Sequence, residues 1–449
     1  MKNSTPVACD MLIVHGYVVS GDEAFTILRD GAVAVLGNSI LDVGRTSDLV
    51  ARYEPGHLID ATNRIVMPGL VNMHNHSPLM VTRGMVEDLG FAPAYTPNIP
   101  QGHALSNEDA LALARLGLFE MMRFGSTTIV DFYNHAEALA RAAAEIGVRS
   151  FVGGRIHDAD MAAVASGTWQ YDRAIGEATL RENLDIFDRW DGKENGRIRA
   201  ILGPHAADTC SRELLVEVAE LARARGASVH THLAQSEIEV KRVRERDNRT
   251  PGQLLEEIGL LNENLVAGHC IHLDDDEIAR VGGAGVRVAH SPFGNAVSGR
   301  IAPIRALEAA GATITLCTDT KSGDMFEAMR TAVSVARIRR GSYDLFAPTV
   351  FGWATHNGAA ALGLANRLGM LKPGQLADIV ILDATAPNLC PLIDGAGQVV
   401  YSAVGMNVET VIVDGRMILS RGEPTLFNAD EVVKRAQETA SDLWRRYSQ

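Results

Sequence analysis

The chain has 449 residues, of which 46% are hydrophobic and 22% are charged, and its formal net charge is -13. This length exceeds that of a typical single core, although it fits an α/β barrel with an accessory domain. The acidic balance leaves no basic stripe for nucleic acid or an anionic membrane, so we expect a small neutral or cationic ligand.

The five cysteines are odd in number and show no Cys-x-x-Cys spacing, which favours reduced thiols over disulfides. No apolar leader follows a basic start, and no uncharged run approaches the length of a membrane span. We therefore expect a cytoplasmic protein that makes no membrane contact.

The first segment of the chain predicts a small antiparallel sheet. Short alternating runs such as Met11 to Val14 and Ala32 to Leu36 are punctuated by glycines. The same pattern resumes after Leu371, with strand-like runs at Ala377 to Leu382 and Glu409 to Gly415. We expect the two ends to form one small composite β-sandwich domain from residues 1–66 and 367–428.

The middle of the chain, residues 67–366, has a different pattern. Apolar strand-like runs alternate there with amphipathic helical windows, which is typical of repeated βα units. Eight strands would close a (β/α)8 TIM-type barrel, and residues 429–449 would add a C-terminal helix. The eight candidate strands are Gly69–His74, Thr127–Phe132, Arg149–Gly153, Ile198–Gly203, Ala227–His232, Leu265–His269, Val286–His290 and Thr313–Thr318.

Helix boundaries can be read between these strands. Ser106 to Asp109 is a candidate capping box for a helix that runs to Phe124, with Gly125 as its stop. Cys210 to Glu213 opens a second helix that ends near Gly226.

Metal-type side chains follow four of the predicted strands. His74 and His76 are separated by one residue on an extended segment, so both imidazoles can face one metal ion. His232, His269 and Asp319 stand at the carboxyl ends of later strands. In a barrel this end carries the active site, which favours a metal-dependent hydrolase.

These residues stand in segments that resemble the amidohydrolase superfamily, and in particular the branch of adenosine and S-adenosylhomocysteine deaminases, guanine deaminases and s-triazine hydrolases. The resemblance covers nearly the whole chain. Its strongest segments are Pro68 to His76, Arg83 to Leu89, Gly203 to His205, His232 to Ala234, Gly268 to Cys270, Ile301 to Pro303, Thr318 to Asp319 and Gly369 to Asp378.

The resemblance implies one divalent metal ion held by His74, His76, His232 and Asp319. Zinc is the expected ion, and Fe2+ or Mn2+ would also suit imidazole and carboxylate ligands. His269 would donate a hydrogen bond to the nucleophilic water or the oxyanion, and Asp319 would carry the proton to the leaving group. The predicted fourth strand offers no lysine for a second metal.

One position departs from the deaminase pattern. Gln235 stands three residues after His232, where the deaminases of this branch carry a glutamate that protonates a ring nitrogen. An amide can bind a substrate but cannot relay a proton at neutral pH. The nearby Glu237 and Glu239 could conceivably substitute, although we expect them on a solvated helix face.

Several further residues are candidate substrate contacts. His205, His290 and Arg155 follow predicted strands, and Glu87 lies in a segment that matches the family, where it could also simply pair with Arg83. His230 shares the face of His232 and is a weaker candidate ligand. A proline-rich loop, residues 90–102, would lie over the barrel mouth, where Phe91 and Tyr95 could stack on a flat ring.

Three classes of function remain at this point. The first is a metal-dependent hydrolase of C–N bonds in a small heterocycle, most simply a deaminase. The second is an amide, urea, carbamate or carbon–halogen hydrolase of the same fold, which Gln235 keeps open. The third is a binding protein that has lost catalysis, against which the complete set of metal ligands argues. A homo-oligomer is compatible with the sequence.

Overall fold

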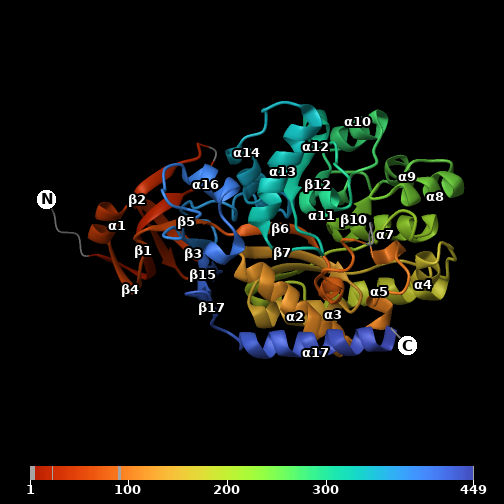
Figure 1. Ribbon diagram of the computed structural model, residues 1–449, viewed down its shortest axis with the longest axis horizontal. Coiled ribbons are helices and arrows are strands. Elements are labelled where there is room, and N and C mark those ends of the chain that lie inside the picture. Colours follow the sequence, from red (N-terminus) through yellow and green to blue (C-terminus); the bar gives the residue numbers. More distant parts are fainter. Residues whose placement is uncertain (1–5, 23, 89–92, 448–449) are drawn as a thin grey trace.

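The computed structural model describes residues 6–22, 24–88 and 93–447. A sheet of nine strands occupies one end of the molecule, and a larger unit of parallel strands surrounded by helices forms the rest (Figure 1). Within the described ranges, no helix is both long enough and apolar enough to cross a membrane.

The nine-stranded sheet contains strands from both parts of the chain. Its order is β17-β16-β15-β14-β5-β1-β2-β3, and β4 pairs with β1. The two parts meet where β14 runs antiparallel to β5, with Val380 opposite Met67. The strands are β1 (Val7–Val19), β2 (Ile27–Leu36), β3 (Ser39–Arg45), β4 (Tyr53–Asp60), β5 (Arg64–Pro68), β14 (Ile379–Asp383), β15 (Val408–Val413), β16 (Arg416–Ser420) and β17 (Glu423–Pro424).

Eight parallel strands form two four-stranded sheets in the larger unit. One sheet contains β6 (Leu70–Asn75), β7 (Ser126–Tyr133), β8 (Arg149–Gly154) and β9 (Ile198–Ala200). The other contains β10 (Val229–Leu233), β11 (Leu265–His269), β12 (Arg287–His290) and β13 (Thr313–Leu316). All eight predicted strands are therefore present, although β9 and β13 end earlier than predicted.

Isolated contacts connect the two parallel sheets. A parallel bridge joins Leu202, just beyond β9, to Val229 at the start of β10. On the other side, the backbone N–H of Asp319 donates to the carbonyl oxygen of His74 at 3.1 Å. Both contacts lie close to strand ends that carry predicted site residues.

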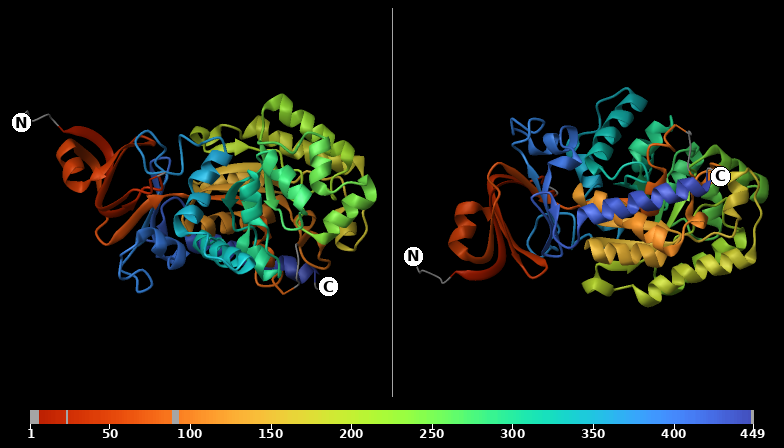
Figure 2. Two further views of the ribbon diagram at one scale, coloured as in Figure 1. Left: turned by 90° about the horizontal axis from the view of Figure 1, so that it is seen from above. Right: turned by 60° about the horizontal axis from the view of Figure 1, so that its bottom comes forward.

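Helices cover the outer faces of these sheets, and α17 runs along the outside of α2 and α3 (Figures 1 and 2). The larger helices are α2 (Asn107–Arg123), α3 (Ala136–Ile146), α5 (Arg173–Arg189), α7 (Arg212–Arg225), α8 (Glu237–Asp247), α10 (Asp275–Gly283), α13 (Met325–Arg340) and α17 (Ala429–Tyr447). The shorter ones are α1 (Thr46–Arg52), α4 (Met161–Ala165), α6 (Lys193–Gly196), α9 (Pro251–Glu257), α11 (Pro292–Val297), α12 (Ile304–Ala310), α14 (Ala347–Trp353), α15 (His356–Ala361) and α16 (Gly395–Tyr401). Short 3-10 turns are η1 (Ser77–Thr82), η2 (Pro93–Tyr95), η3 (Gly102–Ala104) and η4 (Gly405–Asn407).

Local sequence explains where two of these helices begin. The Ser106 side chain accepts from the backbone N–H of Asp109, and the Asp109 side chain accepts from that of Ser106, as the predicted capping box requires. At α7 only one of the two bonds is present: the Ser211 side chain accepts from the backbone N–H of Leu214, and Gly226 ends that helix in the left-handed region.

Alternation along the strands separates two cores. Val130, Phe151, Ile201, Val266, Ala289 and Cys317 share one buried cluster. Their neighbours Ile129, Val152, Leu202, Ala267, Val288 and Leu316 belong to another, which packs under the helices. Because side chains alternate along a strand, Asp319 follows Cys317 on the first face, whereas His290 follows Val288 on the second.

Candidate metal centre

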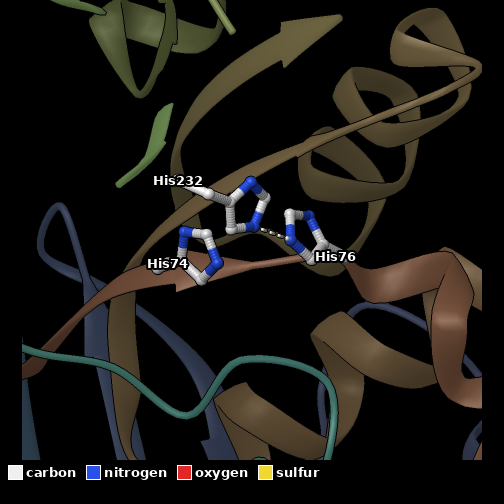
Figure 3. Close-up of side chains that lie close together, drawn as sticks. All are labelled: His74, His76 and His232. Atoms are coloured by element: carbon white, nitrogen blue, oxygen red, sulfur yellow. Dashed lines mark hydrogen bonds between the residues drawn. The ribbon is translucent and has the colours of Figure 1, made fainter. Parts of the chain in front are cut away.

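Three histidines from two sheets converge at one point. His74 lies one residue before the end of β6, His76 follows that strand, His232 lies near the end of β10, and all three rings are directed towards one another (Figure 3). One ring nitrogen from each lies within 4.8 Å of the others, and a second such group combines His74 with His269 and Asp319. The structure thus brings together all five residues predicted for the metal and its immediate surroundings.

Hydrogen bonds fix the tautomers of two of these histidines. The Nδ1 atom of His76 lies 2.6 Å from the carbonyl oxygen of Phe132, and the Nδ1 atom of His232 lies 2.6 Å from that of His205. A carbonyl oxygen only accepts, so each Nδ1 carries the hydrogen and each Nε2 has a bare lone pair. These two Nε2 atoms face each other at 3.1 Å.

The third histidine is held by another imidazole. The Nδ1 atom of His74 lies 2.7 Å from the Nε2 atom of His230, while the buried Nε2 atom of His74 has no hydrogen-bond partner among the described residues. His230, which the sequence suggested only as a weak candidate ligand, therefore contacts a predicted ligand directly. Such a contact orients the ring of a metal ligand and sets which nitrogen is free.

Burial keeps these imidazoles neutral. It lowers the pKa of His76 to about 4, and together with the neighbouring imidazoles it lowers the pKa of His74 and His232 well below the usual range. A neutral imidazole is the form that binds a metal ion. Two facing lone pairs repel each other unless a cation lies between them, so the donor set fits a metal ion.

A carboxylate and a fourth imidazole complete the centre. Asp319 Oδ1 lies 3.8 Å from His74 Nε2, and Asp319 Oδ2 lies 3.9 Å from His269 Nε2. The Nδ1 atom of His269 contacts the side-chain oxygen of Asn295 at 3.1 Å, which fixes its ring. Asp319 and His269 both adopt left-handed backbone angles, with φ of 59° and 68°. Such strained angles are common at functional sites.

The centre opens into a pocket that could hold a small ligand. Its lining includes residues that follow several of the eight strands, together with the segment after Asp319 and part of the loop after β6. The lining residues are His76, Leu79, Pro93, Ala94, Tyr133, Arg155, His205, His232, Gln235, His269, Ile271, Gly294, Asn295, Ser298, Asp319, Thr320 and Lys321. Phe91, named as a possible stacking residue, lies outside the described residues.

Two predicted substrate contacts meet in this pocket. The Nη2 atom of Arg155 donates to His205 Nε2 at 2.9 Å, and the guanidinium lies over the Tyr133 ring, 5.3 Å from its centroid. His205 Nδ1 therefore carries the ring hydrogen and donates it to the Thr209 hydroxyl at 2.7 Å. Burial lowers the pKa of His205 well below its usual range.

Two other predicted substrate contacts lie elsewhere. His290 lines a different cavity, next to Ile301 and Trp353, because it belongs to the strand face that packs under the helices. Glu87 does not line the pocket, and the described ion pair of Arg83 is with Glu120. For both residues, contact with a substrate stays a prediction.

Gln235 lines the pocket, and the structure corrects the expectation for its neighbour Glu239. Glu239 is fully buried rather than solvated, and its carboxylate accepts from the backbone N–H groups of Ala234 and Gln235 at 3.0 and 2.8 Å. Glu237 is exposed, as expected. The helical pattern alone could not separate these two glutamates, because it carries no information about the loop that Glu239 holds.

Comparisons with known proteins agree with this geometry. Residues 65–418 match the model of the Amidohydrolase family. A 5-methylthioadenosine/S-adenosylhomocysteine deaminase from Pelotomaculum thermopropionicum is 33% identical over 97% of this chain and 99% of its own length. A 5'-deoxyadenosine deaminase from Methanothermobacter thermautotrophicus is 35% identical over 93% of this chain and 95% of its own length.

Solved structures give the same result. An adenosine deaminase from Xanthomonas campestris with bound zinc has a TM-score of 0.87 and 28% identity, and the match covers 98% of this chain and 99% of that one. The atrazine chlorohydrolase TrzN from Arthrobacter aurescens shares the fold, with a TM-score of 0.81 and 21% identity over 96% of this chain and all of the other. The chain therefore belongs to the amidohydrolase family, whose members hydrolyse carbon–nitrogen bonds with the help of a metal ion.

Proposed function

We propose that this protein is a hydrolytic deaminase of a small amino-substituted nitrogen heterocycle. The observation that carries the proposal is the pair of bare Nε2 atoms of His76 and His232, which face each other at 3.1 Å beside a ligand pocket. Only a cation makes this arrangement favourable. The deaminase names of relatives that match along nearly the whole chain support the type of reaction.

One divalent metal ion would be held by His74, His76, His232 and Asp319. Zinc is the ion we propose, since imidazole and carboxylate suit it and since the adenosine deaminase of similar fold contains it, while Fe2+ and Mn2+ are the alternatives. Such an ion supplies Lewis-acid activation of water at neutral pH.

The protein's own residues would move the protons. Asp319 would accept a proton from the attacking water and deliver it to the leaving amine, because its carboxylate lies between His74 and His269. His269 would bind the attacking water at Nε2, since Asn295 holds its Nδ1 atom, and it would donate to the developing oxyanion only with a second proton on the ring. Arg155 and His205, which line the same pocket, would contact the substrate, and Gln235 would bind its ring. For His290 and Glu87, substrate contact stays a prediction.

We also propose the finer architecture. The two parallel sheets would form one closed (β/α)8 barrel over residues 67–366, for which the contacts at Leu202 and Asp319 provide the connections. Residues 1–66 and 367–428 would form a β-sandwich, since Ile13, Val33 and Ile379 share a buried core. Residues 429–449 would form the C-terminal helix, which α17 over 429–447 supports. A cytoplasmic location and a homo-oligomer also remain proposals.

A second candidate function follows from Gln235. Hydrolysis of an amide, urea, carbamate or carbon–halogen bond does not require protonation of a ring nitrogen next to the attacked carbon. An amide side chain at this position is therefore compatible with any of these reactions. The relatives named as deaminases favour the first candidate.

Ammonia release from a panel of aminated purines, pterins, pyrimidines and s-triazines tests the proposal. We expect the zinc-loaded protein to release ammonia from one ring class, and His232→Ala to abolish the release and the stoichiometric zinc. His57→Ala, at an exposed histidine of the nine-stranded sheet, is the matched control and should keep both. Silence across the panel by a zinc-loaded, folded protein would favour the second candidate function.

A further inference from the structure

Gln235 lies between the pocket and the side chain of Tyr95. The residue is 2% exposed and lines the pocket, and its backbone is fixed by the buried Glu239 carboxylate. Its side chain ends in one hydrogen-bond donor group and one acceptor. Which of the two points into the pocket decides which atoms of a ring can bind there.

A buried carboxylate behind Gln235 determines this orientation. Asp208 is 0% exposed, and the Tyr95 hydroxyl lies 3.1 and 3.0 Å from its two oxygens. The indole N–H of Trp169 donates to the same carboxylate at 3.3 Å. Burial raises the pKa of Asp208, but the hydrogens donated by Tyr95 and Trp169 stabilise the charged form, which only accepts.

The hydrogen bonds then form a directed chain. The Tyr95 hydroxyl hydrogen is used by Asp208, which leaves the Tyr95 oxygen as an acceptor. The side-chain nitrogen of Gln235 lies 3.5 Å from that oxygen, at the long end of hydrogen-bond range. The reversed amide would place its carbonyl oxygen against an oxygen whose hydrogen is already used, with the Asp208 charge directly behind. Repulsion therefore favours the orientation in which the amide nitrogen of Gln235 faces Tyr95.

We propose that Gln235 presents its carbonyl oxygen to the pocket, and that the site selects rings that carry an N–H next to the attacked carbon. This inference rests on the proposed ring deamination. An unprotonated ring nitrogen, such as N1 of a 6-aminopurine, would meet a second acceptor there and lose its hydrogen bond. A 2-amino-4-oxo ring of the guanine, pterin or isocytosine type offers the required N–H.

The chemistry of such rings also agrees with an amide at this position. Water adds to the carbon that carries the amino group, the bond to the exocyclic nitrogen breaks, and ammonia leaves. The ring nitrogen on the far side of that carbon gains the hydrogen, while the N–H bound by Gln235 keeps its own. Gln235 therefore has no proton to transfer, and Asp319 carries the transfers that remain.

A matched pair of ligands isolates this N–H. Isocytosine has a ring N–H next to its amino carbon, whereas 2-amino-4-methoxypyrimidine carries the same amino group and no ring N–H. We expect the zinc-loaded protein to prefer isocytosine at least tenfold in Kd and in kcat/KM, because a site built for a hydrogen bond rejects a ring that lacks it. The protein should likewise prefer guanosine, whose N1 carries a hydrogen, to its O6-methyl ether, whose N1 does not.

Three variants separate the mechanism from general damage. Tyr95→Phe removes the acceptor for the Gln235 amide. It should bring the ratio of Kd values for the two rings close to one. Gln235→Glu should shift the preference towards the rings without an N–H, because a protonated carboxyl group donates. Trp169→Phe is the matched control, since it removes another donor to Asp208 without touching Gln235, and it should keep the preference.

The outcomes distinguish the role of Gln235 from the proposed deaminase function. Equal binding of the paired rings, or a preference that survives both Tyr95→Phe and Gln235→Glu, would overturn the role of Gln235 even if ammonia release is observed. Absence of ammonia release from every ring would overturn the proposed function, while equilibrium binding of the pair would still test Gln235. If Tyr95→Phe does not fold, Gln235→Glu carries the test by itself.

Discussion

The histidines around the pocket differ in what their second ring nitrogen does. In His76 and His232 it donates to a backbone carbonyl, which no side-chain substitution can remove. In His74 it meets another side chain, His230. The orientation of His74 therefore depends on a residue that would not itself bind the metal.

This dependence predicts the effect of replacing His230. His230→Ala should lower zinc affinity about 10- to 100-fold, the usual result of removing a partner that orients a metal ligand. Competition with a chromogenic chelator measures the affinity, and the exposed His57→Ala variant should match the wild type. An unchanged affinity would show that the contact between His230 and His74 does not position the ligand.

His290 presents a different case, because its titration affects folding. Burial lowers its pKa to about 3, whereas an unfolded histidine titrates near 6.5. Between these values the unfolded chain binds the proton that the folded chain excludes, so His290 costs stability as the pH falls below about 6.5. Above that pH both states are neutral and the cost disappears.

The variant His290→Leu removes this cost. Relative to the wild type, it should gain about 1.4 kcal/mol in free energy of unfolding for each pH unit between pH 6 and pH 4, and no pH-dependent gain above pH 7. Urea denaturation at each pH measures the difference. A parallel pH dependence for both proteins would contradict the burial argument, and a large rise in KM would support the predicted substrate contact.

The predicted ligands could be grouped from the sequence for a physical reason, whereas the contacts of some other residues could not. All five predicted residues lie at or just beyond the carboxyl ends of strands, so finding the strands also locates them: His74, His76, His232, His269 and Asp319. The contacts among Asp208, Tyr95 and Gln235 join loops that are distant in sequence, and the contact of Glu239 with the Gln235 backbone joins a loop to the helix that follows it. No local sequence pattern predicts contacts of this kind. The alternation along β12 could have shown that His290 points away from the pocket, because Ala289 and His290 must face opposite sides of the strand.

At the scale of elements, α17 supports the segment that follows the first two ligands. The Trp444 indole N–H donates to the carbonyl oxygen of Val81 at 2.7 Å, at the end of η1. Leu443 packs in a core with Val81 and Leu113, which lies in α2. The η1 segment begins at Ser77, immediately after His76, so the C-terminal helix is connected to the candidate metal centre through one short turn.

Trp444→Phe tests this connection. It removes the hydrogen bond and keeps most of the apolar contact, so we expect a loss of about 1 kcal/mol in unfolding free energy and faster hydrogen exchange in η1. Val433→Ala, on an exposed part of the same helix, is the control and should change neither. Unchanged exchange in η1 would show that α17 covers α2 without fixing the turn.

At the scale of the whole molecule, one buried ion group joins the parallel strands to the nine-stranded sheet. Arg149 begins β8, and its Nη2 atom lies 3.1 Å from Asp378 and 3.1 Å from Asp414. The Arg149 side chain is 5% exposed and that of Asp378 is fully buried. The neighbouring carboxylates raise the pKa of Arg149, even though its burial alone would lower it.

Removal of one partner should therefore be costly. Arg149→Leu leaves two carboxylates buried without their cation, for which we expect a loss of about 3–5 kcal/mol, and Asp378→Asn should act in the same direction. Arg173→Ala breaks an exposed pair with Glu177 and should leave the free energy of unfolding almost unchanged by comparison. Denaturant unfolding followed by tryptophan fluorescence and by circular dichroism measures both changes in stability.

If Arg149→Leu unfolds in two separate steps, the ion group couples the two parts of the molecule. If its stability equals that of Arg173→Ala, apolar packing alone holds them together.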